Sequence, residues 1–413
     1  VISIKASNTV VMVKTVRLLV DVMEKEGMNF PLHLGVTEAG DGEDGRIKSA
    51  LGIGALLSDG LGDTIRVSLS EAPEAEIPVA RKLVDYVLLR QEHPYIPGLE
   101  APEFNYLSPE RRKTKAVRNI GGEHVPVVIA DRMDGKTEVN PQFTPDYIYA
   151  GRALPEQREE GVEYILDADV WQGEAGTWPA FNHAQLPLMG ECDAALKFLF
   201  IPYMAQTDEV IACLKYHPEV VIISQSNHPN RLGEHRALVH QLMTEGLQNP
   251  VVFFQHYAED DAENLQIKSA ADMGALIFDG LCDGIFLFNQ GSLSHAVVDA
   301  TAFGILQAGR TRTSKTEYIS CPGCGRTLYD LEKTIARIKA ATSHLKGLKI
   351  GIMGCIVNGP GEMADADYGY VGAGRGKISL YKGKVCVEKN IPEEEAVERL
   401  LEFIRTDREE NQQ

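Results

Sequence analysis

An internal repeat restricts the fold of this chain more than any other feature of its sequence. Ile47–Ile65 reads IKSALGIGALLSDGLGDTI and Ile267–Ile285 reads IKSAADMGALIFDGLCDGI, and 12 of these 19 positions are identical. The correspondence continues upstream at nearly the same offset. Self-similarity of this kind indicates one structural unit that is used twice. We therefore expect residues 220–288 to be a second copy of the units in residues 1–69.

The first copy alternates strand-like and helical patterns. Strands are expected over Val1–Ala6, Leu32–Thr37 and Thr64–Leu69, each followed by an amphipathic helix. Three consecutive βα units predict a parallel sheet. They cannot close an eight-stranded barrel, so we expect a partial TIM-type βα-barrel with about five units missing upstream. Because Val1 already lies within a strand-like run, we interpret the chain as a piece of a longer protein.

The remaining sequence divides into three further parts after the barrel units of residues 1–91. Residues 92–123 are rich in proline and include a basic run, and they are expected to be a solvated linker. Residues 124–312 hold six candidate strands and predict an inserted, barrel-like α/β domain. Residues 313–413 predict a small α+β domain with short strands separated by glycine turns. The expected fold class is therefore α/β with a C-terminal α+β domain.

Composition and charge exclude several classes of protein. The 413 residues carry a net charge of −18, which argues against non-specific binding to nucleic acids or anionic membranes. No uncharged apolar run approaches the roughly 18 residues that a membrane helix needs, and no signal peptide is visible. The 7 cysteines are an odd number without the spacing of a disulfide framework, so a reducing compartment is expected.

The two copies differ at the polar ends of their strands. Lys5 aligns with Ser224, Arg66 with Phe286, Ser68 with Phe288, and Glu38 with Tyr257 or Ala258. A copy that keeps its packing residues and loses its strand-end polar groups keeps the fold and loses the site. We therefore expect the second barrel to be catalytically silent.

Three cysteines and one glutamate in the last domain carry the strongest chemical signal. Cys321 and Cys324 are separated by two residues, Cys355 follows after thirty more, and Glu362 ends the string CIVNGPGE. Three thiolates with one weaker oxygen ligand suit a redox-active iron–sulfur centre whose fourth position exchanges with substrate. A thioredoxin-like thiol pair and a zinc site completed by His or Glu are the alternatives. Cys386 is interpreted as a strand-packing residue.

Five ordered motifs resemble those of the 4-hydroxy-3-methylbut-2-enyl diphosphate synthase family. They are Ile4-Lys5-Ala6-Ser7, LHLGVTEAG from Leu32, GDTIRVSL from Gly62, SCPGCGR from Ser320, and CIVNGPGE from Cys355. The resemblance is direct over residues 1–91 and 313–413. The middle of the chain is similar to the extra domain of the large, three-domain form of that family.

The resemblance implies an oxidoreductase of the non-mevalonate isoprenoid pathway with a [4Fe-4S] cluster. Such an enzyme reductively opens the ring of 2-C-methyl-D-erythritol 2,4-cyclodiphosphate. By the family pattern the cluster ligands are Cys321, Cys324, Cys355 and Glu362. The diphosphate would be held by Lys5, Arg66 and Ser68. Glu38 would be the acid/base, and Asn358 a hydrogen-bond donor beside the ligands.

The resemblance also implies partners, and it leaves some questions open. Reduced ferredoxin or flavodoxin is the expected electron donor, and the sequence does not choose between them. Bacterial cytoplasm and plastid stroma are both open, as is the oligomeric state. Because upstream barrel strands are missing, we expect the chain to assemble a cluster but to turn over poorly alone. The alternative interpretation is an inactive fragment or a structural zinc-binding scaffold.

Overall fold

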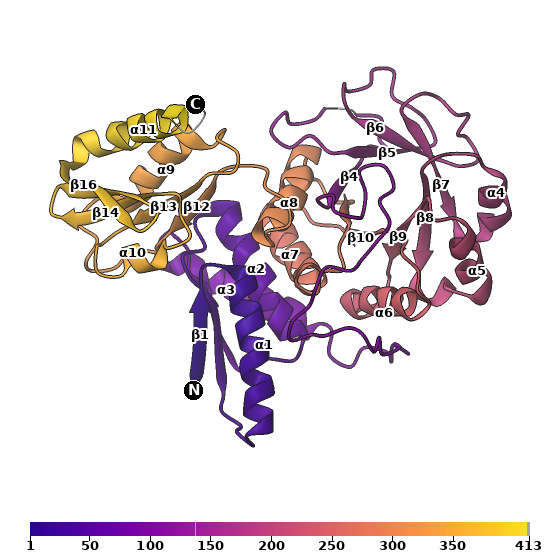
Figure 1. Cartoon of the computed structure of the whole chain (residues 1–413), viewed down its shortest axis with the longest axis horizontal. Helices are drawn as coiled ribbons and strands as arrows, with labels where there is room; N and C mark the ends of the chain where they lie inside the picture. The colour runs from indigo at the N-terminus through magenta and orange to yellow at the C-terminus, as the bar shows by residue number, and fades with distance from the viewer. Residues whose placement is uncertain (137, 411–413) are drawn as a thin grey trace. The chain divides into compact units, whose positions relative to one another are not determined.

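The chain forms two compact units in the computed structural model, which describes residues 1–136 and 138–410. One unit combines Val1–Lys82 with Thr313–Gln413, and the other is Leu83–Arg312. Parallel strands and helices make up most of both units, and a mixed sheet completes the C-terminal part (Figure 1). The predicted fold class is confirmed: a partial βα-barrel, a second barrel and a C-terminal α+β domain.

The first part of the chain is an open, parallel sheet covered by helices. It consists of β1 (Ile2–Ala6), α1 (Thr9–Lys25), β2 (Leu32–Val36), α2 (Gly42–Ser58), β3 (Thr64–Arg66), the 3-10 turn η1 (Pro73–Ala75) and α3 (Glu76–Leu88). The strand order is β1-β2-β3. Leu34 and Val36 are buried on one face, whereas Lys5 and Arg66 are exposed on the other. The sheet therefore has the apolar outside and polar inside of a barrel segment.

The middle of the chain closes into a barrel of eight parallel strands. Its elements are β4 (Val127–Asp131), β5 (Tyr147–Gly151), β6 (Glu163–Asp167), β7 (Thr177–Asn182), η2 (His183–Gln185), α4 (Leu186–Glu191), β8 (Lys197–Pro202), η3 (Tyr203–Ala205), α5 (Asp208–Tyr216), β9 (Val220–Gln225), α6 (Arg231–Thr244), β10 (Val251–Tyr257), α7 (Ala262–Phe278), β11 (Gly284–Asn289) and α8 (His295–Ala308). The barrel closes through β11 and β4. Tyr147, Phe198 and Phe286 fill its interior, so the barrel is a packed core.

Two of the eight strands have no clear signal in the sequence. Strand β7 contains Pro179, which has no N–H to donate to a neighbouring strand and so argues against a strand. Strand β5 has only 5 residues and ends at Gly151, whose φ is +64°. Both segments still form strands, because the closed barrel places a pairing strand on each side of them.

The repeat is confirmed by a duplicated ion pair. In the first copy, Arg17 Nη2 of α1 lies 2.8 Å from Asp59 Oδ2 at the end of α2. In the second copy, Arg236 Nη2 of α6 lies 2.9 Å from Asp279 Oδ2 at the end of α7. Each pair joins two successive helices at a shielded position. Residues 220–288 therefore repeat residues 1–69 in packing as well as in sequence.

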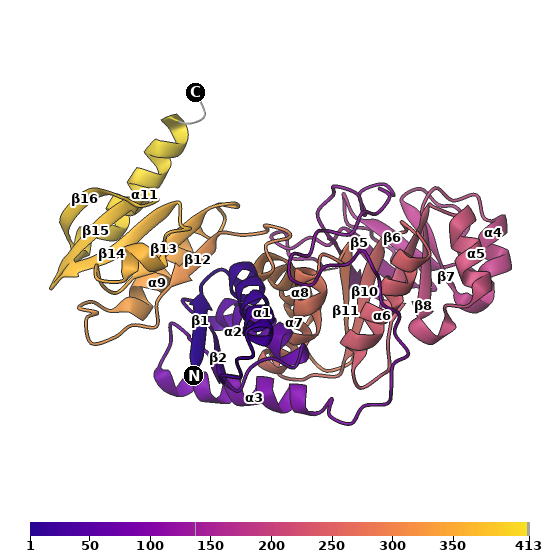
Figure 2. The same ribbon diagram turned by 60° about the horizontal axis from the view of Figure 1, so that its bottom comes forward.

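The C-terminal part is one mixed sheet with helices. It consists of β12 (Glu317–Ser320), α9 (Leu331–Thr342), β13 (Lys349–Met353), α10 (Gly359–Glu362), β14 (Tyr368–Gly374), β15 (Lys377–Lys382), β16 (Val385–Pro392) and α11 (Glu393–Glu410). Figure 2 shows the strands side by side in the order β12 to β16. Strands β12, β13 and β14 are parallel, so the loops that follow them share one end of the sheet.

Ion pairs attach this sheet to the open barrel segment within the first unit. Lys315 Nζ lies 2.7 Å from both Glu43 Oε1 and Asp44 Oδ1 at the start of α2. Ser70 Oγ donates to the carbonyl oxygen of Ser320 over 2.9 Å. These contacts place the end of β12 against the loops that follow β2 and β3, where the site lies.

Every helix in residues 1–136 and 138–410 is too short or too polar to cross a membrane.

Candidate functional site

Two cations lie at the carboxyl ends of strands in the open sheet. Lys5 is near the end of β1 and Arg66 ends β3, and both side chains are exposed. Thr37 and Glu38 follow β2, which lies between those two strands. Because the carboxyl ends of parallel strands meet at one edge of a sheet, these four residues gather at one place. The two cations give this place the charge that binds phosphate groups.

The C-terminal domain brings three thiols to one end of its own sheet. Cys321 directly follows β12, Cys324 lies in the next turn, and Cys355 follows β13. The backbone N–H of Gly354 donates to Cys321 Sγ over 3.2 Å, and that of Arg326 donates to Cys324 Sγ over 3.4 Å. Backbone donors of this kind stabilise thiolates that hold a metal centre.

Helix α10 positions the remaining two predicted residues. Asn358 is its N-cap and Glu362 is its last residue. A Cβ atom at Gly359 would lie only 2.7 Å from Cβ of Met353, so the glycine lets the helix lie directly against β13. The glycine-rich string therefore has a steric purpose, which is to bring Glu362 close to the thiols.

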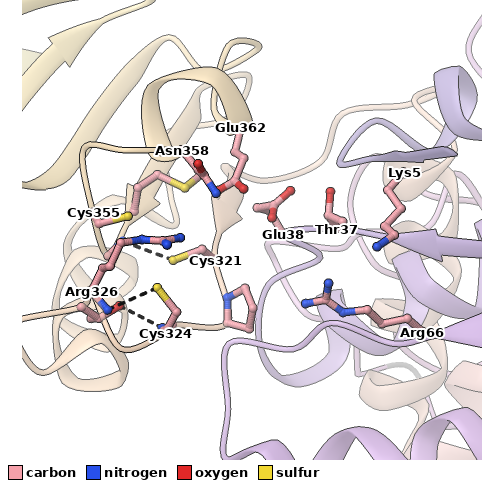
Figure 3. Close-up of a pocket in the computed structure, with 16 residues that line it drawn as sticks. Lys5, Thr37, Glu38, Arg66, Cys321, Cys324, Arg326, Cys355, Asn358 and Glu362 are labelled. Carbon is pink, nitrogen blue, oxygen red and sulfur yellow. Dashed lines mark hydrogen bonds between the residues drawn. The ribbon is translucent and has the colours of Figure 1, made fainter. Parts of the chain in front are cut away.

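Both groups of residues line one cavity of about 510 Å³ within the first unit. Figure 3 shows Lys5 and Arg66 on one side, the thiols on the other, and Thr37 and Glu38 between them. Its lining contains these predicted site residues: Lys5, Glu38, Arg66, Cys321, Cys324, Cys355, Asn358 and Glu362. Parts of the chain about 300 residues apart thus build a single site.

Glu38 is the most perturbed acid in the cavity. Its side chain is 6% exposed, and its φ of +49° is rare for a residue other than glycine. Burial raises the pKa of Glu38, the Thr37 side chain and the nearby cations oppose this rise, and the charge of Glu362 adds to it. Together these effects give a pKa of about 7. An acid with a pKa near neutral can donate a proton and take one back under physiological conditions.

Ser68 is the predicted site residue that the structure does not bring to the cavity. It lies two residues beyond β3 and is 1% exposed. Among the described residues, none forms a hydrogen bond with its hydroxyl group. Contact between Ser68 and a phosphate would require this segment to move, so its role stays a prediction.

The sequence analysis assigned no role to Arg326, which also lines the cavity. Burial alone would raise the pKa of Cys355, but the Arg326 guanidinium group and backbone N–H groups lower it overall. Burial raises the pKa of Cys321, which is more enclosed. The sequence feature that could have identified Arg326 is its place, two positions after the second cysteine of the C-x2-C pair. Thr327 was missed as well, because an isolated threonine has no recognisable pattern.

The other cysteines lie outside this cavity. Cys386 packs in β16 against Met353 and Met363, which agrees with its interpretation as a packing residue. Cys192, Cys213 and Cys282 are free thiols in the middle barrel.

The donor set has the ligand chemistry of an iron–sulfur cluster. Among the residues that the structure describes, no three His, Cys, Asp or Glu side chains are grouped closely enough to hold a metal ion as they stand. The thiols and Glu362 instead line the cavity from different loops. Three thiols with backbone N–H donors and one carboxylate are the ligand chemistry of such a cluster.

The second barrel has different groups at the equivalent positions. Ser224, opposite Lys5, shares a hydrogen bond of 2.7 Å with the buried His235. Tyr257, near the position of Glu38, donates to Asp272 over 2.6 Å. The mouth of this barrel encloses a cavity of about 490 Å³ whose floor is aromatic and whose lining contains no cysteine. These positions therefore support the fold of the second barrel instead of forming the same site.

The fold and the site together define a class of protein in which a βα-barrel segment with strand-end cations is combined with a domain that brings three thiols to the same cavity. Residues 1–81 match the GcpE TIM-barrel domain family, and residues 317–406 match the GcpE protein C-terminal domain family. The chain belongs to the family of 4-hydroxy-3-methylbut-2-en-1-yl diphosphate synthases, which are iron–sulfur enzymes.

Bacterial relatives match almost the whole chain. The protein named 4-hydroxy-3-methylbut-2-en-1-yl diphosphate synthase (flavodoxin) from Bacteroides thetaiotaomicron is 95% identical over 410 residues, which are 99% of this chain and 67% of the relative. The protein of that name from Bacteroides fragilis strain YCH46 is 83% identical over 98% of this chain and 65% of its own length. The one from Porphyromonas gingivalis is 47% identical over 98% and 64%. The chain thus spans about two thirds of the length of these curated relatives.

Proposed function

We propose that this chain contributes the iron–sulfur domain and part of the substrate barrel to a 4-hydroxy-3-methylbut-2-enyl diphosphate synthase. The reaction is the reductive ring opening of 2-C-methyl-D-erythritol 2,4-cyclodiphosphate. One observation carries this proposal: two strand-end cations and three thiols line the same cavity. The relatives' names support the choice of substrate.

The barrel side of the cavity binds and orients the substrate. The ammonium group of Lys5 and the guanidinium group of Arg66 hold the diphosphate through charge-assisted hydrogen bonds. This arrangement directs the ring of the substrate toward the thiol side, where Asn358 donates a hydrogen bond. Ser68 joins the diphosphate contacts only if its segment opens.

The thiol side holds the cofactor. Cys321, Cys324 and Cys355 would bind a [4Fe-4S] cluster firmly, and Glu362 would bind it weakly through oxygen. When bound, such a cluster supplies the two electrons and a Lewis-acidic iron.

Glu38 supplies one of the protons that the reaction consumes. Opening the ring breaks the ring C–O bond to phosphate, and loss of the neighbouring hydroxyl group as water breaks a second C–O bond. A C=C bond forms between the two carbons, and the whole change consumes two electrons and two protons. The carboxyl group of Glu38 lies between the two sides of the cavity (Figure 3) and donates one of those protons. Its burial keeps bulk water from taking over that step.

The organisation of the chain supports this assignment. We retain residues 1–91 as barrel units, 92–123 as a linker, 124–312 as a catalytically silent barrel and 313–413 as the cluster domain. The expectation that the linker is solvated was wrong for its second half, because Arg112 is buried and donates to backbone carbonyls of the middle barrel, and Ile120 packs in that barrel's core. The second barrel is assigned as silent because Ser224 and Tyr257 form internal hydrogen bonds at the equivalent positions. The relatives are bacterial, which favours the bacterial cytoplasm over a plastid, and their printed names favour flavodoxin over ferredoxin as electron donor.

Metal analysis of the anaerobically reconstituted chain tests the proposal. We expect about four irons and four sulfides per chain, with a visible absorption band. Cys355→Ala should lose both, whereas Cys386→Ala, the matched control in a strand, should keep them. One zinc without iron, or no metal in the wild type, would favour the scaffold interpretation and exclude the reductase.

A turnover assay tests a separate hypothesis. Because about a third of the relatives' length lies outside the aligned region, we expect residues 1–413 alone to turn over poorly with substrate and reduced flavodoxin. Full turnover by this chain would contradict that expectation and leave the cluster assignment intact.

A further inference from the structure

The loops that carry the thiols also turn apolar side chains toward solvent. Ile356 and Val357 directly follow Cys355 and are 50% and 69% exposed, and Leu328 is 51% exposed. None of these three side chains lines the cavity. Neighbouring large apolar side chains on a surface usually mark a place where another molecule binds.

The two loops that carry these side chains lie side by side. Thr327 packs directly on the second thiol loop, because a Cβ atom at Gly354 would come within 2.1 Å of Thr327 Oγ1. The hydroxyl of Tyr329 donates to the carbonyl of the residue before Gly354 over 3.0 Å. The loop that contains Leu328 is therefore fixed beside the loop that contains Ile356.

Two cations lie at the same end of the sheet. Arg375 and Lys377 form the turn between β14 and β15, and both are exposed. Strand β14 runs parallel to β13, so this turn and the loop after β13 share one end. A Cβ atom at Gly372 would come within 2.3 Å of the Gly354 carbonyl oxygen, which shows how close they are. Among the described residues, the structure gives neither cation an ion-pair partner.

We propose that Leu328, Ile356, Val357, Arg375 and Lys377 form the docking surface for the protein electron donor, a flavodoxin, which would meet them with an apolar face and acidic groups around it. This inference rests on the proposed function. We call these five residues the loop patch. It is carried by the loops whose thiols line the cavity and by the neighbouring turn, so a donor bound there would lie beside the proposed cluster site.

Charge and its place beside the thiol loops together favour this surface. The chain carries a net charge of −18, so most of its surface repels an acidic partner. The loop patch combines apolar contact area with two cations that have no ion-pair partner in the described structure. Electron-transfer complexes are small and transient, and such a patch of a few residues is sufficient for them. Cationic residues around an apolar centre give both rapid encounter and the right orientation.

Calorimetric titration of the chain with a purified bacterial flavodoxin tests the inference. Val357→Asp and Arg375→Glu should each weaken binding about tenfold. The effect of Arg375→Glu should shrink as salt rises, because salt screens an exposed charge. The matched control is Lys384→Glu with Val385→Asp. That pair also offers an exposed cation and a 66% exposed valine, but it lies in the turn at the opposite end of β15. The control should leave the affinity unchanged.

The results separate this inference from the proposed function. Unchanged affinity in Val357→Asp and Arg375→Glu, an equal loss in the control, or no binding by the wild type would overturn the docking surface. So would a change in the mass of the chain itself in these variants, because that would make the patch a self-association surface. Iron and sulfide are measured on the same samples. A wild-type chain without a cluster would instead overturn the proposed function, and flavodoxin binding is read without needing the cluster.

Discussion

The salt-bridge network at Lys315 allows a quantitative test of how the cluster domain is held on the barrel segment. The ammonium group contacts Glu43 and Asp44 at 2.7 Å, and the side chain of Lys315 is 12% exposed. Lys315→Met keeps the alkyl stem and removes the charge, which leaves two carboxylates with less compensation. Breaking a fully buried pair costs about 3–5 kcal/mol. The carboxylates here are partly exposed and Lys339 remains nearby, so we expect a loss of about 2–3 kcal/mol.

The assay uses the separate location of the tryptophans. The sequence has 2 tryptophans, Trp171 and Trp178, and both lie in the middle barrel. Calorimetry follows both units, whereas tryptophan fluorescence follows only the second. For a domain of 150–250 residues, the expected loss lowers the unfolding temperature by about 4–12 °C. We expect this decrease in the calorimetric transition of the first unit and no change in the fluorescence transition.

The control is an exposed pair in the same unit. Arg337 and Glu398 are 2.8 Å apart with side chains 44% and 64% exposed, so Arg337→Met should cost less than about 0.5 kcal/mol. If Lys315→Met changes the transition no more than Arg337→Met does, the network does not hold the domains together. An equal shift in the tryptophan fluorescence transition would show that the two units do not unfold separately. The loss could then not be assigned to the first unit.

Three further measurements test other parts of the structure. Nearby lysines lower the pKa of Asp44 in spite of its burial. The ionised Asp44 carboxylate therefore stabilises the fold fully above about pH 5, and this stabilisation is lost as the pH falls through the lowered pKa. The difference in unfolding free energy between wild type and Asp44→Asn should accordingly shrink as the pH falls below about 5. Asp279→Asn removes the carboxylate charge that pairs with Arg236 and should lower the fluorescence transition of the middle barrel by several degrees, and no shift would show that the duplicated pair is unimportant. Lys5→Ala should weaken binding of inorganic diphosphate about tenfold by equilibrium dialysis, and unchanged affinity would remove Lys5 from the anion site.

Much of the fold was predictable because the repeat transfers information between its copies. A sequence pattern that occurs once can be ambiguous, whereas a pattern that occurs twice indicates a structural unit. In each copy an arginine pairs with an aspartate at the equivalent position. Strand β7 was not predictable in this way, because Pro179 hides it and no second copy of it is visible. Closure of the barrel is a tertiary effect that no local pattern contains.

The residues of the site were more predictable than their arrangement. The motifs identify Lys5, Arg66 and the cysteines as chemical groups. They do not say that Glu38 is buried, because its burial depends on a domain that begins about 270 residues later in the chain. The same limit applies to Ser68, which is near the motif in sequence but outside the cavity. Arg326 was missed because the direction of a loop side chain depends on the packing around it.

The comparison of the two barrels suggests how a copied unit loses a site without losing its fold. In the first copy the strand ends present charged groups that are held apart in an open cavity, which weakens the fold and serves the chemistry. In the second copy Ser224 bonds to a buried histidine, and Phe286 is 1% exposed in the barrel interior. These replacements exchange charged strand-end groups for groups that make internal contacts. We therefore expect that restoring lysine at position 224 would destabilise the middle barrel, because the new charge would face a buried histidine instead of a phosphate. Unchanged unfolding of Ser224→Lys, measured by tryptophan fluorescence, would contradict this account of the divergence.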